Sequence, residues 1–255
     1  MSKISIIIPH YNGYEILNNC LKSLYQSNLD DSEIIIVNNN STDDSIDKIK
    51  NIFPDIVILN LSENKGYAGG CNYGANHATG ELLVFLNNDT EVSKDWLAEL
   101  INILNSDSSI SSVQPKILSK QNNNKFDYAG ASGGFIDKYC YPFSRGRIFH
   151  TIENDSGQYE DKKKIFWASG TAFMTKKTIF LELKGFDERL FAHMEEIDYH
   201  WQCQLQGYEV WVEPKSIVFH HGAITLPASS SQKTYLNYRN SLILLLTNYE
   251  NKKII

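Results

Sequence analysis

The chain has 255 residues, of which 42% are hydrophobic and 21% are charged. This composition allows one large domain, or two closely fused ones, with a substantial core, and it excludes an intrinsically disordered chain. The formal net charge of -6 argues against nucleic acid as a partner. The four cysteines are scattered without metal-site spacing, which is typical of reduced thiols in a cytosolic protein.

No apolar run reaches the length of a transmembrane helix. The chain enters an apolar strand at Ile4, without the pattern of a signal peptide before it. We therefore expect a cytoplasmic protein whose contact with a membrane, if there is one, is peripheral at the inner face.

The first half of the chain alternates apolar runs with helical patterns. The runs of Ile, Val and Leu have the length of buried parallel strands, and the segments between them carry apolar residues at helical spacing. This alternation predicts βαβ units and a mainly parallel sheet. We expect strands at 4–8, 33–37, 56–61 and 82–86, and helices at 14–25, 45–53, 67–78 and 95–104.

The second half is less regular. Polar loops are expected at 121–124 and around 154–164, strand-like runs at 165–174, 210–212 and 217–219, and helices at 195–206 and 235–249. Gly207 follows the first of these helices, where glycine commonly ends a helix with a left-handed backbone.

Polar residues gather where the early strands end. Residues 9–12 (Pro-His-Tyr-Asn) follow the first strand, and residues 38–41 (Asn-Asn-Asn-Ser) follow the second. A glycine-rich stretch at 64–70 follows the third strand, and residues 87–89 (Asn-Asn-Asp) follow the fourth. The carboxyl ends of parallel strands lie along one edge of a sheet, which is where α/β folds bind nucleotides.

Asp89 is the only carboxylate of the last cluster. A carboxylate with amide neighbours suits a divalent cation that keeps its waters and also binds through the phosphates of a ligand. The same residue fits equally well in a polar turn that caps the next helix. In the glycine-rich stretch, Gly66 and Gly69 allow the backbone to approach a ligand, at the start of a helix whose amino end can hold phosphate.

These segments together resemble family 2 glycosyltransferases, and most of all the bacterial rhamnosyltransferase branch that builds cell-surface polysaccharide. The matching segments stand in the family's order and cover nearly the whole chain, at 5–13, 37–43, 64–72, 87–89, 167–174, 185–188, 195–198 and 214–220. The resemblance implies an α/β fold of the GT-A type, a nucleotide-diphosphate sugar donor, a divalent metal (Mg²⁺ or Mn²⁺) and inversion at the anomeric carbon.

The resemblance also implies how the chain is organised. One continuous GT-A domain would hold a Rossmann-like nucleotide-sugar half at 1–112 and a mixed half at 113–255, which binds the acceptor and carries the catalytic base. The acceptor would be a glycan or a lipid-linked glycan. The residues implied to bind the sugar donor are Pro9, Tyr11, Asn12, Asn38, Asn64, Gly66, Gly69, Asn88 and Arg239. Arg239 fits equally well as a solvated charge on the last helix.

Two positions depart from the family pattern. Asn38 stands where the family usually has an Asp that contacts the base of the sugar donor, and its amide can still form a hydrogen bond but carries no charge. Asn87 stands where the metal motif usually begins with Asp, which leaves Asp89 as the only carboxylate of that motif. Asn at this position occurs among close relatives of this branch, so we expect an active site.

Inverting transfer needs a base that deprotonates the hydroxyl of the acceptor and a cation that neutralises the leaving diphosphate. Glu196 stands where the family carries its base, usually Asp, and Glu195 and Asp198 are the further catalytic candidates. As carboxylates in the first turn of a helix, Glu195 and Glu196 would also stabilise the helix dipole without any catalytic role.

His220 ends an apolar run and, in the family, helps to hold metal or diphosphate; neutral imidazole is a good ligand beside a carboxylate. We therefore expect Asp89 and His220 to form the metal site, with His221 as the competing histidine. Residues 167–174 are expected to line the sugar and acceptor side, except Phe173 and Met174, which fit an ordinary core strand.

Two other functions compete with sugar transfer. A nucleotidyltransferase would also bind a nucleoside phosphate and metal at this edge, but such an enzyme is expected to carry a basic, glycine-rich loop after the first strand. Residues 9–15 contain no Lys or Arg, which argues against that function. A non-catalytic module that binds sugar nucleotides is favoured by the two Asn replacements and opposed by the retained acidic and histidine residues.

Overall fold

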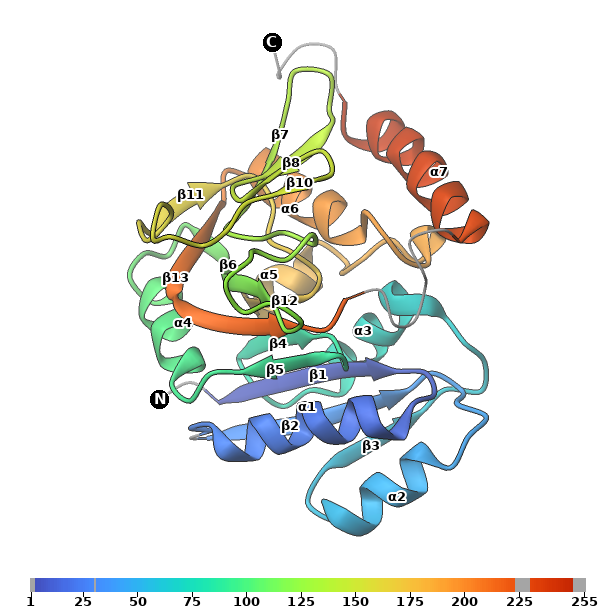
Figure 1. Cartoon of the computed structure of the whole chain (residues 1–255). Helices are drawn as coiled ribbons and strands as arrows, with labels where there is room; N and C mark the ends of the chain where they lie inside the picture. The colour runs from blue at the N-terminus through green and yellow to red at the C-terminus, as the bar shows by residue number, and fades with distance from the viewer. Residues whose placement is uncertain (1–2, 30, 223–229, 250–255) are drawn as a thin grey trace.

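The computed structural model describes residues 3–29, 31–222 and 230–249, and Figure 1 shows its α/β architecture. A nine-stranded sheet runs through the molecule, and a separate four-stranded sheet lies toward the top of that view. Among the helices of the described residues, none is long and apolar enough to cross a membrane. All four cysteines are free, as the sequence predicts.

The N-terminal part forms the parallel strands that its apolar runs predict. β1 (Ile4–His10) pairs with β2 (Ser32–Asn38) and with β4 (Leu82–Leu86), and β3 (Val57–Asn60) pairs with β2. Side chains of β1 alternate between two cores, because Ile6 and Ile8 pack on one face of the sheet and Ile7 packs on the other. Strands buried on both faces read as continuous apolar runs, which is why the sequence identifies them.

Helices cover both faces of this sheet. One face carries α1 (Tyr14–Gln26), α2 (Ser45–Ile52) and α4 (Trp96–Leu104), and the other carries α3 (Gly66–His77), α5 (Lys177–Glu182) and α6 (Glu195–Leu205). The end of α6 has the predicted form, since Gly207 has a φ of 86° and Tyr208 N–H donates to the Cys203 carbonyl.

The second half continues the same sheet with mixed strand directions. β12 (Ala172–Lys176) pairs antiparallel with β4 and with β6 (Ile110–Ser119), and β13 (Glu209–His220) lies parallel to β6. β5 (Thr90–Val92) and β11 (Lys163–Ile165) pair antiparallel with β13. The expected division between residues 112 and 113 therefore falls inside β6, and the sheet is continuous across it.

Several predicted boundaries in this half were wrong. The run at 165–174 is two strands, β11 and β12, because the residues between them leave the sheet. The runs at 210–212 and 217–219 belong to one strand, β13, whose register shifts between Glu213 and Ile217. The last helix, α7 (Ser231–Asn248), begins at Ser231 and not at Tyr235, with the Ser230 side chain as its cap.

Sequence reasoning missed β6, because polar residues interrupt its apolar pattern. Its Ser112, Gln114 and Lys116 are nevertheless buried, and each finds a partner elsewhere in the chain. Ser112 donates to the Thr175 hydroxyl at 3.0 Å, and Lys116 pairs with Asp155 at 2.8 Å. Partners distant in sequence thus satisfy a buried polar strand.

A smaller sheet follows β6 in the chain. Its antiparallel strands pair in the order β10-β9-β8-β7, and they are β7 (Gly134–Ile136), β8 (Pro142–Ser144), β9 (Arg147–Ile148) and β10 (Thr151–Ile152). In Figure 1 these strands lie above the middle of the large sheet, and α7 stands to their right. No element of this sheet was predicted, because its strands are too short for a periodic pattern.

The loop that leads into α6 has an unusual backbone. After the 3₁₀ turn η1 (Glu188–Leu190), Phe191, His193 and Met194 have φ values of 64°, 71° and 75°, which non-glycine residues rarely adopt. Asn240 of α7 holds this loop, because its buried side chain donates to the carbonyls of Leu190, Ala192 and His193 at 2.9, 2.9 and 2.6 Å. Surrounding contacts must stabilise such a strained segment.

Replacing Asn240 with Leu should destabilise the fold. The substitution keeps the size of the side chain but removes its N–H groups from buried carbonyls, which typically costs about 1–3 kcal/mol. Urea unfolding should show this loss in the free energy of unfolding. Ser241→Ala is the control, because the Ser241 hydroxyl bonds only within its own helix, to the Asn237 carbonyl. Equal midpoints for Asn240→Leu and the parent would contradict the assignment.

Candidate active site

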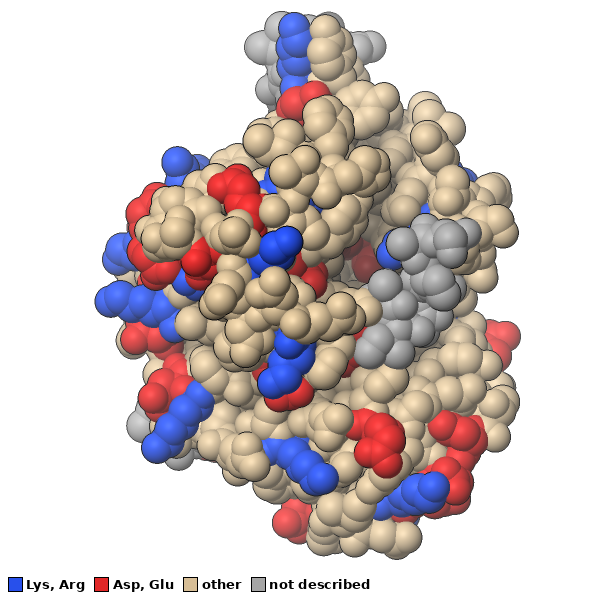
Figure 2. All heavy atoms as spheres, in the orientation of Figure 1, with Lys and Arg blue, Asp and Glu red and all other residues tan. Residues whose placement is uncertain are grey.

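A cavity of about 490 Å³ opens at the carboxyl ends of β1 and β4. Its walls include residues 9–11, 87–89, 128–130, 169–171 and 192–197, together with Trp167, His220 and the start of α7. Figure 2 shows the hollow in the face of the molecule, with Asp and Glu atoms inside it and Lys or Arg atoms near its edge. Of the predicted residues, Pro9, Tyr11, Asn88, Asp89, Glu195, Glu196 and His220 line this cavity.

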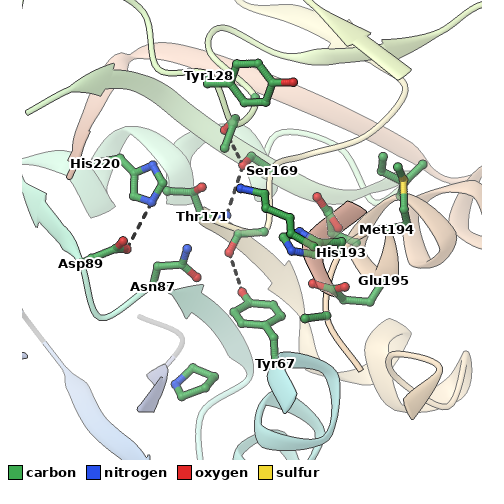
Figure 3. Close-up of a pocket in the computed structure, with 18 of the residues that line it drawn as sticks. Tyr67, Asn87, Asp89, Tyr128, Ser169, Thr171, His193, Met194, Glu195 and His220 are labelled. Carbon is green, nitrogen blue, oxygen red and sulfur yellow. Dashed lines mark hydrogen bonds and ion pairs between the residues drawn. The ribbon is translucent and has the colours of Figure 1, made fainter. Parts of the chain in front are cut away.

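Strand pairing brings Asp89 and His220 together. β13 places His220 opposite Thr90 of β5, next to Asp89, and the His221 N–H donates to the Asp89 carbonyl at 2.9 Å. His220 Nε2 then lies 3.2 Å from Asp89 Oδ1 (Figure 3), and its Nδ1 lies 2.9 Å from Asp127 Oδ1. His221 instead lies 3.0 Å from Glu91, so the structure separates the two competing histidines.

The Asp89 and His220 pair fits a divalent cation that also binds a ligand. Asp89 Oδ1 is buried and has no hydrogen-bond partner within residues 3–29, 31–222 and 230–249, because its contact with His220 lacks hydrogen-bond geometry. Within the described residues, no group of three or more His, Cys, Asp or Glu side chains could hold a metal ion. Two protein ligands are enough for a cation whose other positions are filled by phosphate oxygens and water.

The charge state of His220 is linked to that cation. Burial disfavours the protonated ring, but the hydrogen bond to Asp127 and the neighbouring Asp89 outweigh burial and raise the pKa of His220 to about 10. A histidine ligand must be neutral, so binding of a cation here would release a proton.

Asn88 is held in place by a chain of hydrogen bonds. Burial lowers the pKa of His10 to about 4, against a smaller opposing effect of Asp43, so the ring is neutral. Asn88 Nδ2 donates to His10 Nδ1 at 2.9 Å, which leaves His10 Nε2 to donate to the Ser45 hydroxyl at 2.9 Å. Ser45 donates in turn to Asp43 at 2.5 Å. This chain fixes the strand end that forms the cavity floor.

Asn38 does not line this cavity. Its side chain donates to Asn60 and accepts from the Ser41 N–H, both at 2.8 Å, and it borders a second cavity of about 310 Å³. The next residue, Asn39, lines the main cavity, where it accepts from Lys65 N–H and donates to the Gly66 carbonyl. Asn38 and Asn39 are neighbours at the end of β2, and they border different cavities because successive side chains of a strand point to opposite sides.

The glycine-rich segment lies behind the cavity wall. A side chain at Gly66 would place its Cβ 2.2 Å from the Phe191 carbonyl oxygen, and Ala68 N–H donates to that same oxygen. Asn64 accepts from Gly66 N–H at 2.9 Å, and a Cβ at Gly69 would lie 2.5 Å from the Lys65 side chain. Gly66 thus allows α3 to pack closely against the loop before α6, whereas Gly69 leaves room for the Lys65 side chain. Asn64, Gly66 and Gly69 do not border the cavity.

Asn12 and Arg239 also lie outside the cavity lining. The Asn12 side chain accepts from Thr42 N–H at 2.8 Å, next to the second cavity. Arg239 donates to the carbonyls of Arg189 and Leu190 at 2.8 and 3.0 Å. Arg239 is half-buried and holds the loop before α6, which differs from both expected roles, a contact with diphosphate and a solvated charge.

The first turn of α6 brings two carboxylates to the cavity. Glu195 is buried and Glu196 is half-buried, and one oxygen of each has no hydrogen-bond partner among the residues that the structure describes. Both lie beside Gly170, since a Cβ there would be 3.6 Å from Glu196 Cδ and 3.8 Å from Glu195 Oε1. Asp198 points away from the cavity and toward α7. Its carboxylate accepts hydrogen bonds from Asn248 of α7 and from Gln202 of its own helix.

The two carboxylates differ in what surrounds them. Burial, and then the charge of Glu196, raises the pKa of Glu195 well above its usual range. Burial also raises the pKa of Glu196, but backbone hydrogen bonds at Glu196, Gly170, Ile197 and Met194 favour its ionised form. Two adjacent buried carboxyls do not both ionise readily, so Glu195 holds the proton more strongly.

Further residues line the cavity, and some of them lie in the segments that resemble the family. Tyr67 donates to the Gly170 carbonyl at 2.5 Å (Figure 3), and Trp167 and residues 169–171 line the cavity as expected, whereas Phe173 and Met174 lie in the core. Sequence reasoning missed Tyr128, Arg147, His193, Lys233 and Asn237. Only His193, two residues before the acidic pair, stands close enough to a motif to have been found from sequence.

Comparison with known proteins agrees with this geometry. The O-antigen biosynthesis protein RfbC of Myxococcus xanthus is 26% identical over 246 residues, which are 93% of this chain and 19% of RfbC. The GalNAc(5)-diNAcBac-PP-undecaprenol beta-1,3-glucosyltransferase of Campylobacter jejuni is 26% identical over 246 residues, which are 93% of this chain and 72% of that protein. The chain thus spans about a fifth of the first relative and most of the second.

The fold has a solved counterpart. The crystal structure of GalNAc-T7 with UDP, GalNAc and Mn²⁺ matches 96% of this chain and 48% of that one, with a TM-score of 0.75 and 18% sequence identity. This likeness confirms the predicted GT-A fold. The family model for glycosyl transferase family 2 matches residues 5–183, which is more than half of the chain. The chain therefore belongs to glycosyl transferase family 2.

Proposed function

We propose that this chain transfers a hexose from a nucleotide-diphosphate sugar to a glycan or lipid-linked glycan acceptor, with inversion, in the synthesis of cell-surface polysaccharide. The observation that carries the proposal is one cavity with two unlike ends, a cation site at Asp89 and His220 and a pair of buried carboxylates at Glu195 and Glu196. A rhamnose donor remains the expectation from resemblance, and the named relatives support a hexose donor more generally.

Each end of the cavity would have its own role in the reaction. A divalent cation held by Asp89 and His220 would neutralise negative charge on the leaving diphosphate. Glu196 would accept the proton of the attacking hydroxyl, and the backbone N–H groups around it favour the ionised form that this role needs. Glu195, which is more deeply buried, would stay protonated and donate a hydrogen bond.

The names of the similar proteins support the choice of substrates. GalNAc-T7 was crystallised with UDP and Mn²⁺, and the Campylobacter relative is named for an acceptor that carries a diphosphate-linked lipid. Work at the cytoplasmic face of a membrane remains a prediction that follows from such an acceptor. The alternative of a nucleotidyltransferase is opposed by the cavity itself, because residues 9–11 line it without a cation.

Glu196→Gln should slow transfer without weakening the binding of the sugar donor. The change keeps the size of the side chain but removes the proton acceptor, and general base assistance is typically worth about 10²–10⁴-fold in rate. Turnover should therefore fall at least about a hundredfold while KM for the sugar donor stays near that of the parent. Glu195→Gln is the matched control and should stay within about tenfold, since an amide can still donate a hydrogen bond.

If Glu196→Gln and Glu195→Gln lowered turnover by the same factor, the proposed difference in role between the two carboxylates would be wrong. A Glu196→Gln variant with turnover within a few-fold of the parent would remove Glu196 from the mechanism. Release of nucleoside diphosphate from candidate sugar donors by the parent would separate an enzyme from a module that only binds.

The acidic limb of the rate profile should lie at unusually high pH. Burial raises the pKa of Glu196, so the protonated, inactive form persists to a higher pH than for an ordinary glutamate. Turnover should rise with pH through that raised pKa and should already be lost at a pH above the usual glutamate range. A profile of kcat against pH that stays flat down to the usual glutamate range would contradict this.

Asp89→Ala should abolish the effect of metal on nucleotide binding. Ligand at about 100 times Kd stabilises a protein by about 2.7 kcal/mol, so thermal unfolding reports the binding. With Mn²⁺ present, a nucleoside diphosphate should raise the Tm of the parent and of the control Asp95→Ala, whose acid is exposed at the start of α4. Unchanged affinity of the Asp89 variant for Mn²⁺ and diphosphate in calorimetry would refute the metal role.

A further inference from the structure

Arg147 differs from the other arginines of the chain. The chain has four, all within the described residues. Arg145 pairs with Asp161 at 2.8 Å, Arg189 pairs with Asp187 at 2.6 Å, and Arg239 donates to backbone carbonyls. The Arg147 side chain forms no hydrogen bond or ion pair with any described residue, and its Nε is buried without a partner.

The surroundings of Arg147 make this lack of a partner costly. The side chain is half-buried and borders the cavity, with its guanidinium 4.2 Å from the centre of the Tyr128 ring. Burial lowers the pKa of Arg147. The charge of the nearby Asp127 offsets this burial only in part, and Asp127 Oδ1 already accepts from Ala129 N–H and contacts His220. A charge removed from water without a partner costs free energy, so a bound anion would explain the arrangement.

The position of Arg147 indicates which substrate carries that anion. Arg147 belongs to β9 of the small sheet, and Tyr128 precedes that sheet in the chain. In Figure 3, Tyr128 lies on the far side of the cavity from Tyr67 and Asn87. Lys233, from the first turn of α7, borders the same cavity and likewise has no side-chain partner among the described residues. Arg147 and Lys233 therefore come from the small sheet and from α7, and not from the ends of β1, β2 and β4 at which a nucleotide would bind.

We propose that Arg147, stacked on Tyr128, binds a phosphate group of the acceptor substrate. The guanidinium fork matches two phosphate oxygens at once, and stacking on an aromatic ring leaves that fork free to bind them. The phosphate could belong to a phosphodiester within a polymer or to the diphosphate that joins a glycan to a lipid. This inference rests on the proposed function and adds the chemical class of its acceptor.

Binding to the nucleotide-saturated protein tests the proposal. The protein is first saturated with Mn²⁺ and UDP or GDP, whichever raises its Tm, so that the diphosphate site of the sugar donor is filled. Calorimetric titration then uses glycerophosphoglycerol as the phosphodiester probe and geranyl diphosphate as the lipid diphosphate probe. Glycerol and geraniol are the uncharged counterparts. We expect one phosphate probe to bind, and which one binds identifies the source of the phosphate.

Arg147→Gln should weaken binding of that probe about ten- to hundredfold, the typical effect of losing hydrogen bonds to a charged group. Arg147→Lys keeps the charge but not the fork, and it should retain part of the affinity. Arg145→Gln is the matched control, because Arg145 lies two residues away and also stacks on a tyrosine, Tyr159, at 5.2 Å. It should bind the probe like the parent.

Three results would overturn the proposal. The saturated parent could bind neither phosphate probe, or Arg147→Gln could bind the probe as tightly as the parent. Alternatively, Arg147→Gln could weaken the binding of Mn²⁺ and nucleotide by the same factor, which would assign Arg147 to the sugar donor. In all three cases the parent still binds nucleotide, so the proposed function stands. A parent that binds no nucleotide would refute the proposed function itself.

Discussion

Parallel pairing of β1 with its neighbours is the constraint on which the site depends. Because β4, β1 and β2 run in the same direction, the polar residues that follow them lie along one edge of the sheet. The antiparallel pairing of β5 with β13 then places His220 opposite Thr90 and beside Asp89. A shift of one residue in that register would turn His220 to the other face of the sheet.

Burial and neighbouring charges decide which side chains of the cavity are charged. His10 and His193 are neutral because burial lowers the pKa of each to about 4, with a further contribution from Lys233 for His193. The cations that border the cavity are therefore His220, whose pKa is raised to about 10, and Arg147 and Lys233, and each comes from a different element. A site arranged in this way suits a reaction in which a proton leaves one group while negative charge builds on another.

The loop before α6 links the stability of the C-terminal helix to the acidic pair. Three non-glycine residues of this loop have positive φ values, and such a backbone persists only where its surroundings hold it. Asn240 and Arg239 of α7 donate to its carbonyls, and Phe191 packs against Gly66 of α3. The orientation of Glu195 and Glu196 therefore depends on segments nearly 50 and more than 120 residues away in the chain.

Sequence alone determined the parallel strands, their helices and the edge at which Asp89 lies, because burial on two faces and polar strand ends leave local patterns. It also identified His220 and the acidic pair, through their resemblance to a family. Only the tertiary structure decided that Asn39 rather than Asn38 borders the main cavity, that Asp198 faces α7, and that the Arg147 side chain finds no hydrogen-bond partner in the described part of the chain. The polar strand β6 was likewise hidden, since its buried Ser112 and Lys116 are satisfied by residues far along the chain. The periodicity of apolar residues indicates which face of a helix or strand is buried. The hydrogen-bond or ion-pair partner of a given side chain depends instead on how distant elements pack together, and a local sequence pattern does not contain that information.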